Sequence, residues 1–269
     1  VTGLEIIGNT RKTGTKVTFK PDARVFHGNI SLNYDTLAER LQEIAFLNAG
    51  LKVTLKDERT GREDVFHYEG GASQFVAFLN EGKNVLTDVI HFCAERDDIE
   101  VEVALQYNDG YTETIASFVN SIPTRGGGTH ETGFKTAYTR VMNEYARKNG
   151  ILKEKDKNLD GADLREGMIA VINVKMADVE FVGQTKDQLG SASARSAVDA
   201  VVSDKMAVFL EENPQVAQQL LKKAILAAKA REAARKAREE VRSGKKRSES
   251  SNLGGKLTPA QSKDYLRNE

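Results

Sequence analysis

The sequence predicts an α+β fold, an α/β sandwich of sheet and helices, on the strength of three observations. Helical and strand periodicities alternate along the chain, so neither kind of element dominates. Residues 168–176 (MIAVINVKM) form a continuous apolar run of β-rich composition, which is typical of a central strand. Residues 214–241 predict one long exit helix that begins at Pro214, with Asn213 as its cap.

The first part of the chain predicts a strand, a helix and a hairpin in that order. Residues 16–20 alternate in character and predict the strand. Apolar side chains recur every three or four positions in residues 35–50, which predicts a helix with Asp35 as its cap. Residues 51–68 alternate again on both sides of a turn and predict a β-hairpin. We expect a domain boundary at Gly70-Gly71.

The next part predicts a short helix and a second hairpin. The helix includes Phe75 and Leu79. Residues 101–107 and 111–119 then alternate as strands, and Asn108-Asp109-Gly110 between them is a strong turn signal. We therefore expect these two strands to pair directly.

Helices dominate the remainder of the chain. Residues 134–150 carry one apolar helical face, residues 152–165 are polar and predict a loop, and residues 198–209 predict another helix. Beyond Ala228 the long helix has no large apolar residue until Val241, so this part cannot bury a core of its own.

Composition excludes several classes of protein. The 269 residues suffice for one large domain or two modest ones, and 39 basic residues balance 39 acidic ones, so no overall charge attracts nucleic acid or membrane. The single cysteine, Cys93, excludes a disulfide framework. The four histidines show no HxxxH or HxH spacing, so we expect no metal site. No apolar run could span a bilayer and the N-terminus is no signal peptide, so we expect a cytoplasmic protein without a membrane partner.

Two local features stand out from this balanced composition. Residues 222–247 contain eleven Lys or Arg and only three Glu, which suits a phosphate backbone as well as it suits a solvated helix. The run Gly126-Gly127-Gly128 lacks the Gly-Lys-Thr/Ser continuation of a P-loop, so it predicts a hinge and no phosphate cradle.

Five blocks of sequence resemble the B subunits of bacterial type IIA DNA topoisomerases, gyrase and topoisomerase IV. In chain order they are residues 67–71 (HYEGG), 126–134 (GGGTHETGF), 183–190 (GQTKDQLG), 228–238 (AKAREAARKAR) and 255–259 (GKLTP). Residues 150–159 and 256–263 look more like topoisomerase IV than gyrase, which stays the alternative.

The resemblance implies an arrangement of domains. Residues 1–70 would be the C-terminal part of a GHKL-type ATPase domain, and residues 71–241 a transducer domain of ribosomal-protein-S5-like fold with helices on one side of a sheet. Residues 242–269 would be a linker toward a missing TOPRIM domain. The absence of an initiator Met and the abrupt end fit an excised piece of a longer protein. The family's catalytic glutamate, magnesium-binding asparagine and ATP lid would lie upstream, so we expect no catalytic residue and no metal ligand here.

The resemblance also implies site residues. Gln184 and Lys186 match the two residues that touch the γ-phosphate of ATP, and Thr15 matches a threonine that helps hold adenine. A lysine on a loop suits that task because it is a mobile point charge. Lys135 matches a basic residue that faces the DNA passage, and Arg140 and Arg165 are weaker DNA-facing candidates.

The implied partners are those of the family. They are ATP and Mg²⁺ in the full-length protein, DNA, the A subunit of the same topoisomerase and a second copy of the B subunit. A different class, a GHKL/S5-fold chaperone or mismatch-repair-like protein, is the competing interpretation. The joint presence of the 228–238 and 255–259 blocks argues against it.

Overall fold

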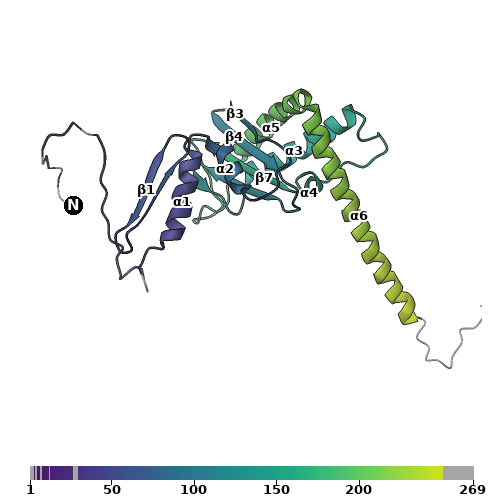
Figure 1. Ribbon diagram of the computed structural model, residues 1–269, viewed down its shortest axis with the longest axis horizontal. Helices are drawn as coiled ribbons and strands as arrows, with labels where there is room; N and C mark the ends of the chain where they lie inside the picture. The colour runs from purple at the N-terminus through teal and green to yellow at the C-terminus, as the bar shows by residue number, and fades with distance from the viewer. Residues whose placement is uncertain (1–2, 4, 7, 12, 27–29, 251–269) are drawn as a thin grey trace, which may run out of the picture.

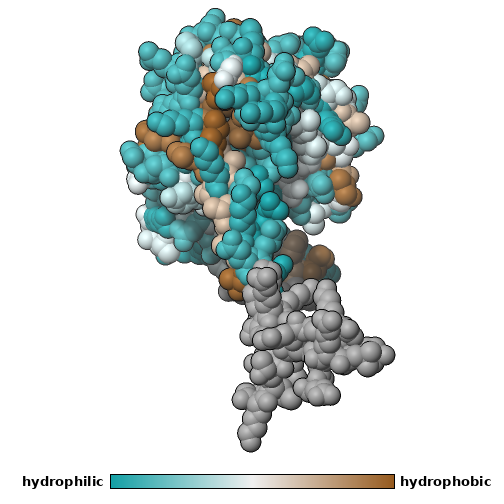
Figure 2. Space-filling view, turned by 90° about the vertical axis from the view of Figure 1, so that its right-hand side faces the viewer, coloured by the Kyte–Doolittle hydropathy of each residue, from teal (hydrophilic) through white to brown (hydrophobic). Residues whose placement is uncertain are grey.

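The computed structural model describes residues 3, 5–6, 8–11, 13–26 and 30–250, with side chains up to residue 242. The chain forms a two-stranded sheet with helix α1 (Tyr34–Leu47) at one end of the molecule and a five-stranded mixed sheet at its centre. Helix α6 (Pro214–Ser250) projects from the opposite end (Figure 1). The face from which α6 leaves is largely hydrophilic (Figure 2). The α+β prediction is confirmed.

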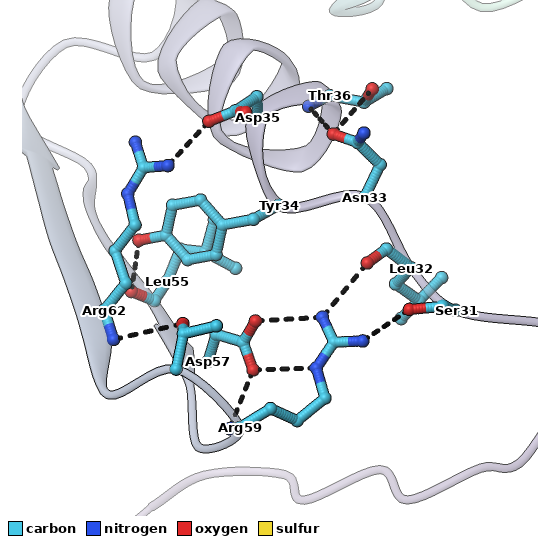
Figure 3. Close-up of polar contacts among 11 residues, drawn as sticks. Ser31, Leu32, Asn33, Tyr34, Asp35, Thr36, Leu55, Asp57, Arg59 and Arg62 are labelled. Atoms are coloured by element: carbon cyan, nitrogen blue, oxygen red, sulfur yellow. Dashed lines mark hydrogen bonds and ion pairs between the residues drawn. The ribbon is translucent and has the colours of Figure 1, made fainter.

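The small unit joins α1 to the antiparallel hairpin of β1 (Lys52–Asp57) and β2 (Arg62–His67), as the sequence predicts. Its cap differs from the prediction. The side chain of Asn33 accepts a hydrogen bond from the backbone of Thr36 at 3.0 Å, which satisfies a free N–H of the first turn. Asp35 lies inside that turn and instead accepts from Arg62 at 2.6 Å (Figure 3).

A second ionic contact fixes the hairpin turn to the chain before α1. Arg59 donates to both carboxylate oxygens of Asp57 at 2.9 Å and to the hydroxyl of Ser31 at 2.6 Å (Figure 3). The side-chain hydrogen bonds from Arg59, with its backbone N–H and charge, lower the pKa of Asp57 to about 2. Asp57 therefore stays ionised and holds both segments together at neutral pH.

The predicted strand at residues 16–20 is wrong. This segment has no regular structure, and the side chains of Val17 and Phe19 are 78% and 77% exposed. A strand needs a neighbour for its backbone N–H and C=O groups, and none of the described strands pairs with this segment.

The central sheet contains five strands in the order β3-β4-β7-β5-β6. They are β3 (Ile90–Arg96), β4 (Ile99–Tyr107), β5 (Thr114–Val119), β6 (Ile122–Pro123) and β7 (Met168–Lys175). Strand β7 is antiparallel to β4 and parallel to β5, and only its last residue is exposed. The prediction of a central strand at residues 168–176 is confirmed.

The predicted direct pairing of residues 101–107 with 111–119 is wrong, because β7 lies between β4 and β5. The turn signal at residues 108–110 is used differently. The backbone N–H of Asn108 donates to Gly167, just before β7, and that of Asp109 donates to Asn84. The long apolar strand gains more by insertion at the centre than the local turn gains by closing a hairpin.

The actual two-residue turns lie where the local sequence signals are weaker. Asp97 and Asp98 connect β3 to β4 with φ of 53° and 59°, and Asn120 and Ser121 connect β5 to β6 with φ of 49° and 62°. Positive φ at both central residues matches the twist of the strands. Strand β3 was not predicted.

Helices cover both faces of the sheet, which corrects the expectation of helices on one side. Helix α2 (Gly71–Leu79) packs Phe75 and Val76 against one face, where Ile169 of β7 is buried. Helices α3 (Thr129–Lys148) and α5 (Ala192–Glu212) cover the other face. A strand buried on both sides reads as a continuous apolar run, as β7 does.

The end of α1 packs against α2 rather than standing apart. Phe46 stacks on Tyr68 with ring centroids 3.6 Å apart and on Phe75 at 4.8 Å. Arg40 of α1 also donates to the backbone of Ser121 at 2.5 Å. One apolar cluster therefore includes residues on both sides of position 70.

Helix α6 is longer than predicted. Its first part is buried through Leu220, Leu221 and small alanines, whereas Leu226, expected in the packed part, is 58% exposed. Residues 229–242 are all exposed, and the helix runs past Gly244 to Ser250, about 55 Å at 1.5 Å per residue. Residues 242–250 of the expected linker are therefore helical, which corrects that part of the expectation, and residues 251–269, with the 255–259 block, lie outside the described residues. The predicted loop at 152–165 contains a short helix, α4 (Gly161–Leu164).

Two tyrosines and one carbonyl form a buried hydrogen-bonded chain beneath α4. The hydroxyl of Tyr107 donates to the backbone oxygen of Leu164, and the hydroxyls of Tyr107 and Tyr138 are 2.7 Å apart. Both tyrosines are almost fully buried, so neither hydroxyl has water as an alternative partner.

The Tyr107→Phe variant should therefore lower the free energy of unfolding by about 1–3 kcal/mol, because it leaves the Leu164 carbonyl and Tyr138 hydroxyl unsatisfied. Thermal and urea unfolding measure this change. Tyr111→Phe is the control, since Tyr111 is 84% exposed and should not change the melting temperature. Equal melting temperatures for both variants would contradict the role of the buried chain.

Candidate functional site

The lysine loop, residues 180–190, carries Gln184 and Lys186 and is a short hairpin that projects from the main body. The backbone N–H of Val182 donates to Gln188 at 2.9 Å, and that of Gly190 donates to Glu180 at 2.7 Å. These bonds close the base of the loop. Residues 182–188 are all exposed, so the tip projects into solvent.

Lys186 occupies the tip in an unusual backbone conformation. Its φ is 59°, in the left-handed region that costs roughly 1–2 kcal/mol for a residue with a Cβ atom. Its N–H donates to Gly183 at 3.1 Å, which closes a tight turn. The ammonium lies 5.8 Å from the ring centroid of Phe181, and no carboxylate pairs with it among the described residues. The tip therefore presents a positive charge with free hydrogen-bonding capacity.

The three nucleotide-binding candidates are not brought together. Gln184 lies exposed two residues before Lys186, whereas Thr15 lies in the exposed segment before α1. No described hydrogen bond or ion pair links Thr15 with either residue. No group of three or more His, Cys, Asp or Glu that could hold a metal ion occurs within the described part of the chain.

Lys135, the first DNA-facing candidate, is paired with two carboxylates. Its ammonium lies 2.7 Å from Glu131 and 3.3 Å from Glu113. Partial burial alone would lower the pKa of Lys135, but the hydrogen bonds and charges of the two glutamates outweigh it and raise the pKa. Its charge is thus permanent and partly neutralised.

The other two DNA-facing candidates are also paired. Arg140 donates to Asp199 at 2.6 Å and to Ser203 at 2.7 Å, across from α3 to α5. Arg165 lies 3.1 Å from Glu113, and its side chain is only 11% exposed. Lys135 and Arg140 line one groove of about 490 Å³ along α3, to which Arg165 does not contribute.

The basic residues of α6 divide into two groups. Arg231 donates to both oxygens of Asp163 at 2.9 and 2.8 Å and also lies 2.6 Å from Asp160, so it ties the helix to α4. Lys223, Arg235 and Lys236 also pair with glutamates, at 3.8, 3.1 and 3.1 Å. Four further basic side chains of α6 make no ion pair with any described residue. They are Lys222, Lys229, Arg238 and Arg242, all exposed.

His130, in the first turn of α3, is a buried polar residue for which the sequence predicted only the absence of a metal site. It is 0% exposed, its Nε2 lies 3.1 Å from the hydroxyl of Thr124, and its Nδ1 has no partner among the described side chains and backbone. Burial lowers its pKa to about 4. Thr124 in turn contacts Ser117, which lies 3.4 Å from Glu131. A lone histidine between polar neighbours carries no sequence signal for this burial.

The pKa of His130 predicts a pH dependence of stability. Below about pH 6.5 the unfolded chain protonates this imidazole, whereas the folded chain resists protonation until about pH 4, so stability falls as the pH decreases through this window. Between pH 7 and pH 5 this loss should be about 2 kcal/mol. Urea unfolding of wild type and His130→Gln at both pH values measures it. Identical pH dependence in the two proteins would contradict the assignment.

Comparison with known proteins adds to these observations. A family model described as DNA gyrase B matches residues 71–240. The whole chain is similar to the B subunit of DNA topoisomerase 4 from Bacillus subtilis (strain 168), with 57% identity, and to that from Staphylococcus epidermidis, with 58% identity. The match covers 41% of each relative, so the chain spans less than half of their length.

Solved structures agree in fold. The 43K ATPase domain of Thermus thermophilus gyrase B, in complex with an aminocoumarin, matches with a TM-score of 0.70 and 42% identity over 82% of this chain and 59% of that one. The topoisomerase IV ATP-binding domain of Francisella tularensis shares the fold with a TM-score of 0.65 and 24% identity, over 78% of this chain and 57% of that one.

The family match, the identity to the relatives and the shared fold define the class of protein, a B subunit of the type IIA topoisomerases. The chain belongs to the DNA gyrase B family. Among the described helices, none is both long and apolar enough to cross a membrane.

Proposed function

We propose that this chain couples ATP binding to DNA strand passage within the B subunit of a type IIA topoisomerase. The observation that carries the proposal is Lys186, an unpaired and exposed lysine held in a left-handed conformation at a loop tip. Backbone strain of this kind is retained where the surrounding structure requires it, and it concentrates at functional sites.

The chemistry of the loop suits a terminal phosphate. Lys186 would contact the γ-phosphate of ATP as a point charge, and Gln184 would add amide N–H donors. Since ADP lacks this phosphate, the two contacts would exist in only one nucleotide state, which is the requirement for a nucleotide switch. Thr15 would help hold the adenine. ATP would bind with Mg²⁺ in the full-length protein, and the described residues offer no ligand set for that ion.

The path from this loop to DNA would run through the packed helices. Helix α5 leads directly into α6 at Asn213 and Pro214, and the first part of α6 is buried in the core. Arg231 clamps α6 to Asp163, which is 5% exposed. The exposed remainder of α6 would then move as one rigid lever with the central sheet.

The DNA side of the mechanism would use basic side chains on α3 and α6. Lys135 and Arg140 line the α3 groove, and a phosphate could replace the carboxylates that now partner them. Arg165 is less accessible. The unpaired basic residues of α6 would add sequence-independent attraction.

Topoisomerase IV is the proposed parent enzyme and gyrase the alternative. The identity of 57–58% to B subunits named for DNA topoisomerase 4 supports this choice. The enzyme would assemble around DNA as a heterotetramer of B subunits and A subunits.

Replacement of Lys186 tests the coupling role. In the full-length B subunit, combined with its A partner, Lys186→Ala should lower the ATPase rate roughly ten- to hundredfold, because one charge-assisted hydrogen bond contributes about 1.5–3 kcal/mol. Lys205→Ala removes another exposed lysine, on α5, and should have no effect. ATPase and strand passage at normal rates in Lys186→Ala would remove the proposed role.

Replacement of Lys135 tests the DNA-facing role. Lys135→Gln in the same enzyme should make the dependence of DNA affinity on salt less steep, by about 0.9 in the log–log slope for one lost phosphate contact. Lys148→Gln is the matched control at the other end of α3, where Lys148 pairs with Glu211 and is 69% exposed. A slope that stays the same in both variants would exclude Lys135 from the DNA contact.

A further inference from the structure

The loop that carries Lys186 lies against a second loop, residues 126–128, which contains three consecutive glycines. The N–H of Gly126 donates to the carbonyl of Asp187 at 2.8 Å, and the N–H of Leu189 donates to Gly127 at 3.2 Å. The N–H of Thr129 then donates to the carbonyl of Leu189 at 3.1 Å. The returning limb of the lysine loop, residues 187–189, is thus hydrogen-bonded at both of its ends to residues 126–129.

The approach of the two backbones is closest at Gly128. A Cβ atom on Gly128 would lie 2.6 Å from both the backbone N and O of Leu189, where real Cβ contacts do not occur. The φ of Gly128 is 145°, which side-chain-bearing L residues rarely adopt. Because the opposing atoms are backbone, an added methyl group would displace the limb itself and not a flexible side chain.

Gly126 makes a second, milder approach at the other end of the contact. A Cβ atom there would lie 3.1 Å from the carbonyl oxygen of Asp187, the residue that follows Lys186. On the far side, Leu189 is 1% exposed and Thr129 donates its hydroxyl to Ser191 at 2.7 Å. The limb is therefore held from its buried end up to the residue next to Lys186.

In the part of the chain that the structure describes, the tip of the loop is held only by contacts within the loop and is exposed to solvent. A Cβ atom on Gly183 would meet nothing within 4 Å, and Gln184 and Lys186 are exposed. The left-handed φ of Lys186 belongs to the tight turn that its N–H closes onto Gly183, and the direction in which this turn points depends on how the base of the loop is held.

We infer that the glycine loop supports the returning limb of the lysine loop and so fixes the direction in which Lys186 points. Gly128 is then a positioning residue for recognition of a terminal phosphate. This inference rests on the proposed contact of Lys186 with the γ-phosphate. It assigns to Gly126-Gly127-Gly128 a role different from that of a hinge, since a hinge would be free to move and this loop is bonded to its neighbour.

The test measures discrimination between nucleotides in the full-length protein. Gly128→Ala should weaken binding of a non-hydrolysable ATP analogue by tenfold or more while leaving binding of ADP within twofold of wild type. A loss of folding or of the whole pocket would weaken both ligands alike and would overturn the specific role of Gly128. Gly183→Ala is the matched control, because it adds the same methyl group to the lysine loop itself, where a Cβ atom meets nothing within 4 Å.

Combination with Lys186→Ala separates this inference from the proposed function. If Lys186→Ala leaves discrimination unchanged, the proposed contact itself fails. If Lys186→Ala abolishes discrimination and Gly128→Ala retains it, the positioning role of Gly128 is wrong, whereas the contact of Lys186 with the γ-phosphate stands. The double variant should discriminate no worse than Lys186→Ala alone, since both changes act through one contact.

A second variant covers the case in which Gly128→Ala does not fold. Thr129→Val keeps the shape of the side chain and removes only its hydrogen bond to Ser191, directly after the glycine loop. It should reduce discrimination by a smaller factor and speed hydrogen exchange at the amide of Leu189. Wild-type discrimination together with faster exchange would overturn the inference, because the limb would then move without consequence for Lys186.

Discussion

Burial of β7 on both faces is the constraint on which the rest of the fold depends. Its residues alternate between the side covered by α2 and the side covered by α3 and α5, so each face of the sheet must acquire helices. Position at the centre also separates β4 from β5 and sends the chain between β6 and β7 through residues 124–167. The glycine loop, α3 and α4 all lie in that excursion, and the lysine loop follows β7 directly.

Ion pairing distinguishes two kinds of basic side chain on the surface, those that hold helices in place and those that remain unpaired. Glutamates and aspartates partner Lys135, Arg140, Arg165 and Arg231, so these side chains brace α3 and α6 against their neighbours. Lys186 lies apart from such partners among the described residues. A buried or bracing ion pair fixes geometry, whereas an unpaired exposed ammonium keeps its capacity for an incoming anion. The sheet thus supports an unpaired lysine at the tip of one loop and a long helix at the other end of the molecule.

The sequence indicated most elements because their patterns are local. The amphipathic face of α3, the continuous run of β7 and the Asn213-Pro214 junction specify their structures within a few residues. The 16–20 segment shows the limit of that reasoning, since alternation is present there without any paired strand among the described residues. The 108–110 turn shows it again: its local preference is real, but the inserted strand redirects it toward Gly167.

The sequence by itself determined the family, the central strand, the long exit helix and the identity of the lysine loop, because each is written in contiguous residues. Only the tertiary structure decided that helices cover both sheet faces, that Lys135 and Arg165 share Glu113, and that His130 is buried. It alone brought the lysine loop against Gly128. These contacts join residues tens of positions apart, and their geometry follows from how the sheet and helices pack.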